Sequence, residues 1–270
     1  MSSSFDDTRI LGILNVTPDS FSDGGKFLHV KGALSHAKKL IAEGAHIVDV
    51  GAESTAPGVS PVTHEEEWQR LENVLPEVIA LAHGEGVEVS IDTRHAKTAE
   101  KALKHGVDII NDQGGLLDPE MVSVAVNCSA KIIIMHHFGI PVSKNAFPVC
   151  NSDKLVREII GWLLARAKTL CENCVDERRI ILDPGIGFGK TPEHSWHIIK
   201  NIGVFTKLGF DICIGHSRKS MFSAVDVVLE DRDPATAIVA SYLAQQGVKY
   251  IRVHNVALTK TATKIASYLK

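Results

Sequence analysis

An eightfold alternation of short strand-like runs with longer helix-like segments is the feature that most constrains the fold of this chain. The runs are apolar and rich in β-branched residues, and Ile132, Ile133 and Ile134 follow one another without a polar residue between them. Parallel strands that are covered on both faces have this pattern. The predicted strands are residues 9–15, 46–51, 88–92, 107–111, 131–136, 179–183, 211–215 and 250–254.

The segments between these strands have the spacing of amphipathic helices. Leu155, Ile159, Leu163 and Ala167 recur every four residues, which places them on one side of a helix. No linker or low-complexity segment interrupts the alternation. We therefore predict an α/β fold, with residues 1–270 in a single (β/α)8 TIM barrel domain. An open doubly wound sheet is the structural alternative.

Composition narrows the range of partners and compartments. The formal net charge is -3, from 29 basic and 32 acidic residues that form no long run of one sign, so neither nucleic acid nor an anionic membrane is expected to bind. No apolar run reaches the roughly 18 residues of a membrane span, and the polar start is unlike a signal peptide. The 5 irregularly spaced cysteines do not suggest a disulfide framework. We expect a cytoplasmic protein that acts on a small molecule.

Polar side chains follow almost every predicted strand. Barrel enzymes place their chemistry at the carboxyl ends of the strands, so closure would bring these side chains to one pocket. Each of them taken alone could instead cap a helix. They are Asn15, Glu53, Ser54, Thr55, Asp92, Asn111, Asp112, His136, Asp183, Ser217, Lys219, Arg252 and His254.

Four of these residues offer the hydrogen-bonding groups that a pterin requires. Asp92, Asn111, Asp183 and Lys219 come from four different predicted units. A carboxylate can accept the two neighbouring N–H donors of an aminopyrimidinone edge, and an amide and an ammonium group can bind the ring carbonyl and nitrogen. A guanine-like ring would suit the same groups.

A structural reading of the two carboxylates is the alternative. Asp92 and Asp183 could cap helices or pair with the nearby Arg94 and Lys190 without binding a ligand.

The last two units have the features of an anion site, which many barrels place here. The segment GHSRKS, residues 215–220, can present backbone N–H groups and a cation at a helix start. Arg252 can bind phosphate oxygens through its planar guanidinium group. The alternative is that Arg252 and His254 form a buried pair at the end of a strand.

Three other motifs do not predict a site. GIGFGKT, residues 185–191, ends like a P-loop, but the first glycine of that motif would fall on Pro184. His136 and His137 are neighbours on a strand and point to opposite faces, so they do not readily share a metal ion. Cys171 and Cys174 lie in a helical stretch with no second cysteine pair at zinc-like spacing.

Seven motifs, in order from about Leu11 to about Val256, resemble signatures of the dihydropteroate synthases. They are ILNVTPDSFSDGG, ESTAPG, DTR, IND, DPGIGFGK, SRKS and RVHNV. The resemblance implies a transferase of folate biosynthesis, usually a homodimer and a target of sulfonamides. It would join 6-hydroxymethyl-7,8-dihydropterin diphosphate to para-aminobenzoate and release pyrophosphate.

The resemblance also implies a role for particular residues. The pterin would be held by Asp92, Asn111, Asp183 and Lys219. The diphosphate would be held by Asn15, Thr55, Arg252 and His254, with Mg²⁺ as cofactor and Asn15 as its ligand. Para-aminobenzoate would be surrounded by Thr55, Pro57, Phe188, Lys219 and Ser220. The catalytic residues would be Asp92, Lys219, Arg252 and His254.

Three positions depart from the family pattern. Ala56 stands where the family has an arginine, Asn255 where it has an aspartate, and His137 where it has a methionine. A charge-assisted contact to phosphate contributes about 1.5 to 3 kcal/mol, so losing the arginine would slow turnover by roughly ten- to a hundredfold unless another cation replaces it. Arg218 and Lys26 are the candidates for that replacement.

Two other functions are weighed against the transferase. A pterin-dependent methyltransferase barrel would hold methyltetrahydrofolate, but it has little use for the diphosphate residues. A catalytically attenuated pterin-binding paralogue, acting as a carrier or regulator, is suggested by Ala56 and Asn255.

Overall fold

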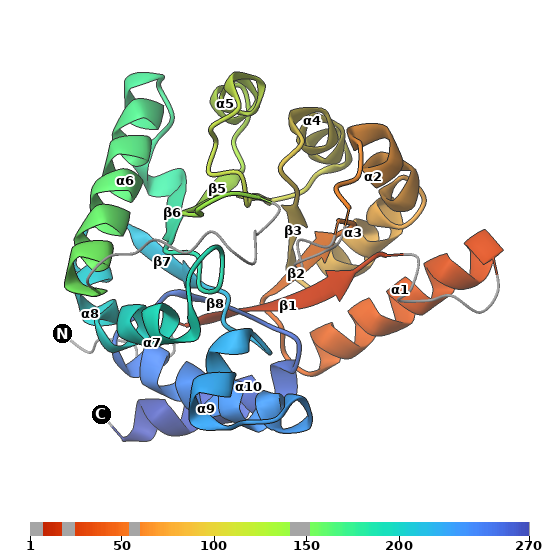
Figure 1. The fold of residues 1–270 in the computed structure, drawn as a ribbon. Coiled ribbons are helices and arrows are strands. Elements are labelled where there is room, and N and C mark those ends of the chain that lie inside the picture. Colours follow the sequence, from red (N-terminus) through yellow and green to blue (C-terminus); the bar gives the residue numbers. More distant parts are fainter. Residues whose placement is uncertain (1–7, 18–24, 54–59, 141–151, 270) are drawn as a thin grey trace.

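Eight parallel strands close into a barrel in the computed structural model, which describes residues 8–17, 25–53, 60–140 and 152–269 (Figure 1). The strands are β1 (Arg9–Asn15), β2 (Ile47–Gly51), β3 (Glu88–Asp92), β4 (Ile109–Asp112), β5 (Lys131–Met135), β6 (Ile180–Asp183), β7 (Asp211–Ile214) and β8 (Tyr250–Val253). They pair in chain order, and β8 pairs with β1, with Arg252 opposite Leu11. The predicted (β/α)8 barrel is confirmed, and the open-sheet alternative is wrong.

Helices fill the connections between the strands and surround the barrel (Figure 1). They are α1 (Gly25–Ala42), α2 (His64–Leu71), α3 (Leu75–Gly84), α4 (Ala96–His105), α5 (Pro119–Val126), α6 (Ser152–Glu172), α7 (Pro192–Lys200), α8 (Ile202–Phe205), α9 (Arg232–Gln245) and α10 (Val256–Tyr268). Short 3-10 helices are η2 (Glu177–Arg179), η3 (Ser220–Val225) and η4 (Leu229–Asp231).

The buried apolar residues form two layers, because successive side chains on a strand point to opposite faces of the sheet. One layer packs between the strands and the helices and includes Val48, Val50 and Leu163. The other layer fills the interior of the barrel near the amino ends of the strands. It consists of Leu11, Ile47, Ile109, Ile133, Ile181, Cys213 and Tyr250. This inner layer closes the amino end and leaves the carboxyl end for polar groups.

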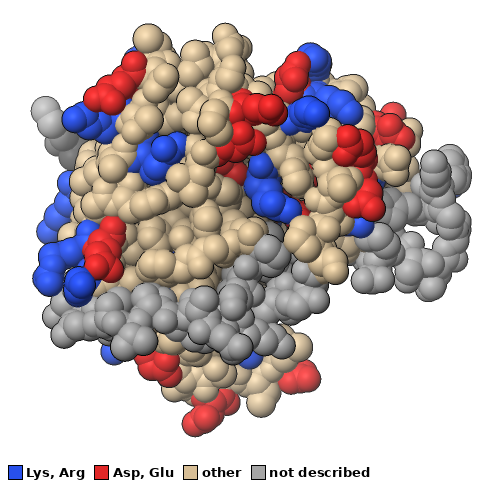
Figure 2. Space-filling view, turned by 45° about the horizontal axis from the view of Figure 1, so that its top comes forward, with Lys and Arg blue, Asp and Glu red and all other residues tan. Residues whose placement is uncertain are grey.

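The surface agrees with the near-neutral composition. On the face in Figure 2, Lys and Arg side chains lie among Asp and Glu side chains and do not gather into one large patch of a single sign. Within the described ranges, no helix combines the length and the apolar character that crossing a membrane would require.

Candidate active site

The predicted pterin residues come together at the carboxyl end of the barrel. Asp92 ends β3 and lies opposite Asn111 of β4 in the strand register, and Asp183 ends β6. Each of these three side chains is buried, with 6% of its surface exposed. Lys219 follows β7, and its ammonium group interacts electrostatically with both Asp183 and Asp92. Four units of the barrel therefore bring polar groups together at its carboxyl end, as the sequence predicts.

Asp92 accepts hydrogen bonds on both carboxylate oxygens. Gln113 Nε2 donates to Oδ1 at 2.5 Å, and Arg252 Nη2 donates to Oδ2 at 2.5 Å. Burial raises the pKa of Asp92 to about 6, although the charge of Arg252 acts in the opposite direction. The suggested pairing of Asp92 with Arg94 is wrong, because Arg94 forms a two-point ion pair with Glu53 at 2.8 and 2.9 Å.

Asp49, which the sequence analysis missed, is the fully buried carboxylate at the centre of β2. Its Oδ2 accepts from Arg252 Nε at 2.5 Å, and its Oδ1 accepts from Asn111 Nδ2 at 3.4 Å. Burial opposes the charged form of Arg252, but Asp49 and Asp92 outweigh it and raise the pKa of Arg252 above its ordinary value. An aspartate within the otherwise apolar run IVDVG is the sequence signal that could have found this residue.

Lys219 and Phe188 form one wall of the pocket. Lys219 Nζ lies 4.2 Å from the centre of the Phe188 ring and donates to the Ile186 carbonyl at 2.5 Å. Burial lowers the pKa of Lys219 to about 8, and the nearby Asp183 carboxylate opposes this shift. Burial raises the pKa of Asp183, while Lys219 lowers it. Lys219 and Asp183 thus each moderate the effect of burial on the other.

Lys190 interacts electrostatically with Asp183, as the structural alternative suggested, but it donates its hydrogen bonds to backbone carbonyls and not to that carboxylate. Its Nζ donates to the carbonyls of His136, Gly185 and Phe188 at 3.2, 2.9 and 3.3 Å. Burial lowers the pKa of this buried lysine to about 7. Lys190 therefore ties the segment after β5 to the segment that carries Phe188.

Ser217 and His254 lie at the neighbouring ends of β7 and β8. Ser217 Oγ and His254 Nδ1 are 2.9 Å apart, and the His254 backbone N–H donates to the same hydroxyl at 3.2 Å. Burial, followed by the charges of Arg218 and Arg252, lowers the pKa of His254 to about 4. The imidazole is therefore neutral near pH 7 and offers hydrogen bonds rather than charge.

Arg218 is engaged with the helical layer. It forms a two-point ion pair with Asp233 of α9 at 2.7 and 2.8 Å, and Asn255 Nδ2 donates to the same carboxylate at 3.4 Å. Asn255 also caps α10 by accepting from the Leu258 N–H at 3.1 Å. Asp233 is therefore a structural partner of Arg218. Asn255, which departs from the family pattern, both caps α10 and binds this partner.

The remaining predicted residues lie at the rim or outside the described residues. Asn15 is exposed at the end of β1, and Ser220 is exposed at the start of η3. Thr55 and Pro57 fall outside the described residues, as do Ala56 and the side chain of Lys26.

The two histidines after β5 have structural partners. The His136 ring packs edge-on against Phe138 and Trp162, with ring centres 4.8 and 5.1 Å apart, and burial lowers its pKa to about 3. His137 accepts from the Gly139 N–H at 3.0 Å. Among the described residues, no group of three or more His, Cys, Asp or Glu side chains is arranged to hold a metal ion. Cys171 and Cys174 are both unpaired thiols.

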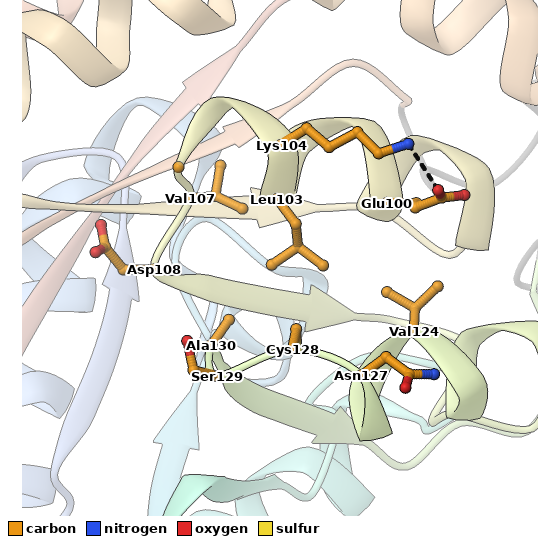
Figure 3. A pocket seen from close by; sticks show the side chains of 11 residues that line it. Glu100, Leu103, Lys104, Val107, Asp108, Val124, Asn127, Cys128, Ser129 and Ala130 are labelled. Atoms are coloured by element: carbon orange, nitrogen blue, oxygen red, sulfur yellow. Dashed lines mark hydrogen bonds and ion pairs between the residues drawn. The ribbon is translucent and has the colours of Figure 1, made fainter.

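A separate groove of about 760 Å³ lies between α4 and α5 (Figure 3). Leu103 and Val124 line it, and Glu100 and Lys104 form an ion pair of 2.7 Å along it. None of the predicted site residues lines this groove, so it is distinct from the pocket at the carboxyl end of the barrel.

The family model of the pterin binding enzymes matches residues 11–254, which is most of the barrel. The fold and the polar pocket agree with that match, because the pocket presents buried carboxylates, an amide and an ammonium group. The barrel is therefore that of a pterin-binding enzyme.

Individual relatives narrow this class. The chain is 40% identical to the dihydropteroate synthase of Bacillus subtilis over 251 residues, covering 92% of this chain and 84% of that protein. A solved dihydropteroate synthase from Anaplasma phagocytophilum, with bound 6-hydroxymethylpterin-monophosphate, is 57% identical. It has a TM-score of 0.92 and covers 98% of this chain and 100% of that one. The Xanthomonas albilineans enzyme with 4-aminobenzoic acid is 30% identical, has a TM-score of 0.89 and covers 98% and 94%.

This chain belongs to the dihydropteroate synthase family and is accordingly a transferase of folate biosynthesis. The matches do not favour a pterin-dependent methyltransferase or an attenuated paralogue.

Proposed function

We propose that this chain joins 6-hydroxymethyl-7,8-dihydropterin diphosphate to para-aminobenzoate at the carboxyl end of the barrel, giving 7,8-dihydropteroate and pyrophosphate. The observation that carries the proposal is the ring of buried Asp92, Asn111 and Asp183, completed by Lys219. The relatives solved with 6-hydroxymethylpterin-monophosphate and with 4-aminobenzoic acid support the choice of both substrates.

The pterin ring would bind to the buried carboxylates and their neighbours. Asp92 would accept the paired N–H donors of the aminopyrimidinone edge, and the Asn111 amide and the Lys219 ammonium group would bind the remaining ring atoms. The pKa of Lys219, about 8, leaves this group mostly protonated at neutral pH. Asp183 would hold Lys219 in place by its opposite charge and accept from the pterin.

The diphosphate would bind between the end of β1 and the ends of β7 and β8. Arg252 would supply the positive charge, and the His254–Ser217 pair would supply hydrogen bonds, because His254 is neutral near pH 7. Preorganised donors of this kind stabilise the charge that develops on a leaving group.

Mg²⁺ is the cofactor that we assign to the diphosphate site, with Asn15 as its protein ligand. The exposed amide oxygen of Asn15 is a hard donor, and Mg²⁺ commonly takes few protein ligands when it also binds substrate phosphates and water. When bound, the ion would neutralise charge on the diphosphate oxygens.

The transfer would need no nucleophile from the protein. The carbon–oxygen bond to the diphosphate breaks with its electron pair on the leaving oxygen, and the pterin ring stabilises the cationic methylene. The arylamine nitrogen then forms the new carbon–nitrogen bond and releases a proton. Phe188, Lys219 and Ser220, together with Thr55 and Pro57, would surround the arylamine, where sulfonamides would compete with it.

We also assign this chain to the cytoplasm, as one domain over residues 1–270 and as a homodimer.

The paired helices α9 and α10 support a dimer, because several large apolar side chains on them are exposed to solvent. Ile238 has 71% of its surface exposed and Ile265 has 56%. Equilibrium sedimentation should give twice the chain mass, and Ile238→Glu should shift the protein toward a monomer. A monomeric wild-type chain would contradict the assignment.

The experiment that tests the reaction is pyrophosphate release from the pterin diphosphate with Mg²⁺, measured with and without para-aminobenzoate. We expect release to require the arylamine and to fall by at least about a hundredfold in Asp183→Asn, whose buried acceptor loses its charge. The control is Asp211→Asn, an exposed aspartate at the opposite end of β7, which should leave release unchanged. Release that is independent of the arylamine would contradict the proposal.

A further inference from the structure

Asp49 connects strands that no backbone hydrogen bonds join. It lies on β2, whose sheet neighbours are β1 and β3, yet its side chain binds Arg252 on β8 and Asn111 on β4. Each of these side-chain bonds passes over one intervening strand inside the barrel. The position of Arg252 relative to Asn111 therefore depends on this one buried carboxylate as well as on the sheet.

The two ends of the Arg252 guanidinium group are held by different carboxylates. Nε donates to Asp49 at 2.5 Å and Nη2 donates to Asp92 at 2.5 Å. Asp92 is the carboxylate to which the proposed function assigns the paired N–H donors of the pterin. A pterin and Arg252 would thus share one carboxylate, whereas Asp49 lies deeper and binds only residues of the protein.

The depth of Asp49 separates it from substrate. Its side chain is fully buried, while 20% of the Arg252 side chain is exposed. A two-point contact fixes a planar guanidinium group in direction as well as in position. Because Asp49 holds Nε, the guanidinium group would stay anchored when substrate replaces the bond between Nη2 and Asp92.

We propose that Asp49 is a positioning residue for the transfer reaction: it anchors Arg252 through Nε, so that pterin and diphosphate can engage the rest of the guanidinium group without displacing it. This inference rests on the proposed function, because it takes Asp92 and Arg252 as the groups that meet the substrate. Asp49 acts only through these residues and does not contact the substrate itself.

The first test is a double-mutant cycle of Asp49→Asn and Arg252→Gln, read out by pyrophosphate release. Asp49→Asn alone should lower kcat by about ten- to a hundredfold, since small displacements of a catalytic group have effects of this size. When Arg252→Gln is already present, adding Asp49→Asn should cost little more, because the two residues act as a unit. Independent, multiplying losses would overturn the proposal. Asp211→Asn, a carboxylate on a barrel strand outside the pocket, serves as the matched control.

A second measurement is made on the wild-type protein and uses a variant only to assign one signal. The Nε–H signal of Arg252 in the wild-type protein, identified by its loss in Arg252→Lys, should exchange slowly with solvent. It should remain protected when the pterin diphosphate is added, because Asp49 still holds Nε. Loss of protection on adding the substrate would overturn the anchoring role.

The outcomes also separate this inference from the proposed function. A wild-type protein that releases no pyrophosphate would count against the proposed function, whereas the protection of Nε would still report on Asp49. Normal release by both the wild type and Asp49→Asn would overturn only the role of Asp49.

Discussion

In β2, β6 and β8 the side chains that point into the barrel change from apolar to charged within two residues. Ile47 and Ile181 belong to the apolar layer at the amino end, and the next inward residues are Asp49 and Asp183. Because residues i and i+2 of a strand share a face, one short strand supplies both environments. The amino end of the interior thus supports the fold, and the carboxyl end holds the buried charges to which we assign the chemistry.

The comparison predicts different consequences of substitutions at the two ends. A residue of the apolar layer should matter for stability and little for turnover, because it touches no substrate. A residue of the polar end should matter for turnover, and for stability only where it leaves a buried charge without a partner.

The largest effect is expected for Arg252→Ala, which leaves Asp49 and Asp92 without their common cation. Turnover should fall by about a hundred- to a thousandfold, because a preorganised group at the leaving phosphate is lost. Stability should fall by about 3 kcal/mol, because buried carboxylates remain unpaired. Pyrophosphate release and urea unfolding measure the two effects. An unchanged free energy of unfolding would show that the ion pairs of Arg252 with Asp49 and Asp92 contribute no net stability.

Ile181→Ala tests the apolar end. Removing this buried side chain should lower the free energy of unfolding by about 2 to 5 kcal/mol, through lost burial and a cavity. At a temperature where the variant is folded, kcat/KM should stay within about threefold of the wild type, because Ile181 lies a layer below the pocket. Val204→Ala, at a valine with 49% of its surface exposed, is the control and should change stability by about 0.5 kcal/mol or less. A large loss of turnover in folded Ile181→Ala would break the comparison.

The pH dependence of pterin binding tests the charge at the polar end. Burial raises the pKa of Asp92 to about 6, so below this pH the side chain takes up a proton and loses acceptor capacity. Affinity for 6-hydroxymethylpterin, measured by calorimetry, should fall by about tenfold per pH unit below about 6. The folded-state pKa lies above the ordinary value, so protonation of Asp92 in this range favours the folded state and does not itself cause unfolding. Asp92→Asn should lack this dependence; a variant that retained it would assign the titration to another group.

The smallest effect is expected for Asn255→Asp. Asparagine and aspartate cap helices about equally well, so α10 should change in stability by only a few tenths of a kcal/mol. The new carboxylate would lie beside Asp233 and strengthen the local negative charge around Arg218. Turnover should change by less than about threefold. A larger change would show that this departure from the family pattern reaches the diphosphate end of the pocket.

Much of the fold was predictable because each strand is a local pattern. The run of Ile132 to Ile134 marks β5 without reference to any other part of the chain, and the observed strand boundaries lie within about two residues of the predicted ones. Strand order followed from the alternation of strands and helices. The gathering of Asp92, Asn111, Asp183 and Lys219 was predictable for the same reason, since each stands at the end of its strand or in the loop that follows it.

Side-chain pairing across the barrel was not predictable. The sequence placed Arg252 near phosphate, but its partners Asp49 and Asp92 depend on how β8 is staggered against β2 and β3, neither of which pairs with it. Arg94 follows Asp92 closely in the chain and instead reaches Glu53 in another unit. Nearness in sequence misled the expectation for Arg94, because this residue lies beyond the end of β3 and its long side chain reaches the segment that follows β2.

The amino group of Lys190, surrounded by three backbone carbonyls, plays the part that a structural metal ion plays in other proteins. Oxygen atoms from two separate segments converge on one buried amino group, much as oxygen atoms surround a bound calcium ion, but this group is part of the polypeptide. The segment that carries Phe188 is therefore tied to the segment after β5 by a group of the polypeptide itself. A chelator should consequently stop turnover by removing Mg²⁺ while leaving the aromatic wall of the pocket in place.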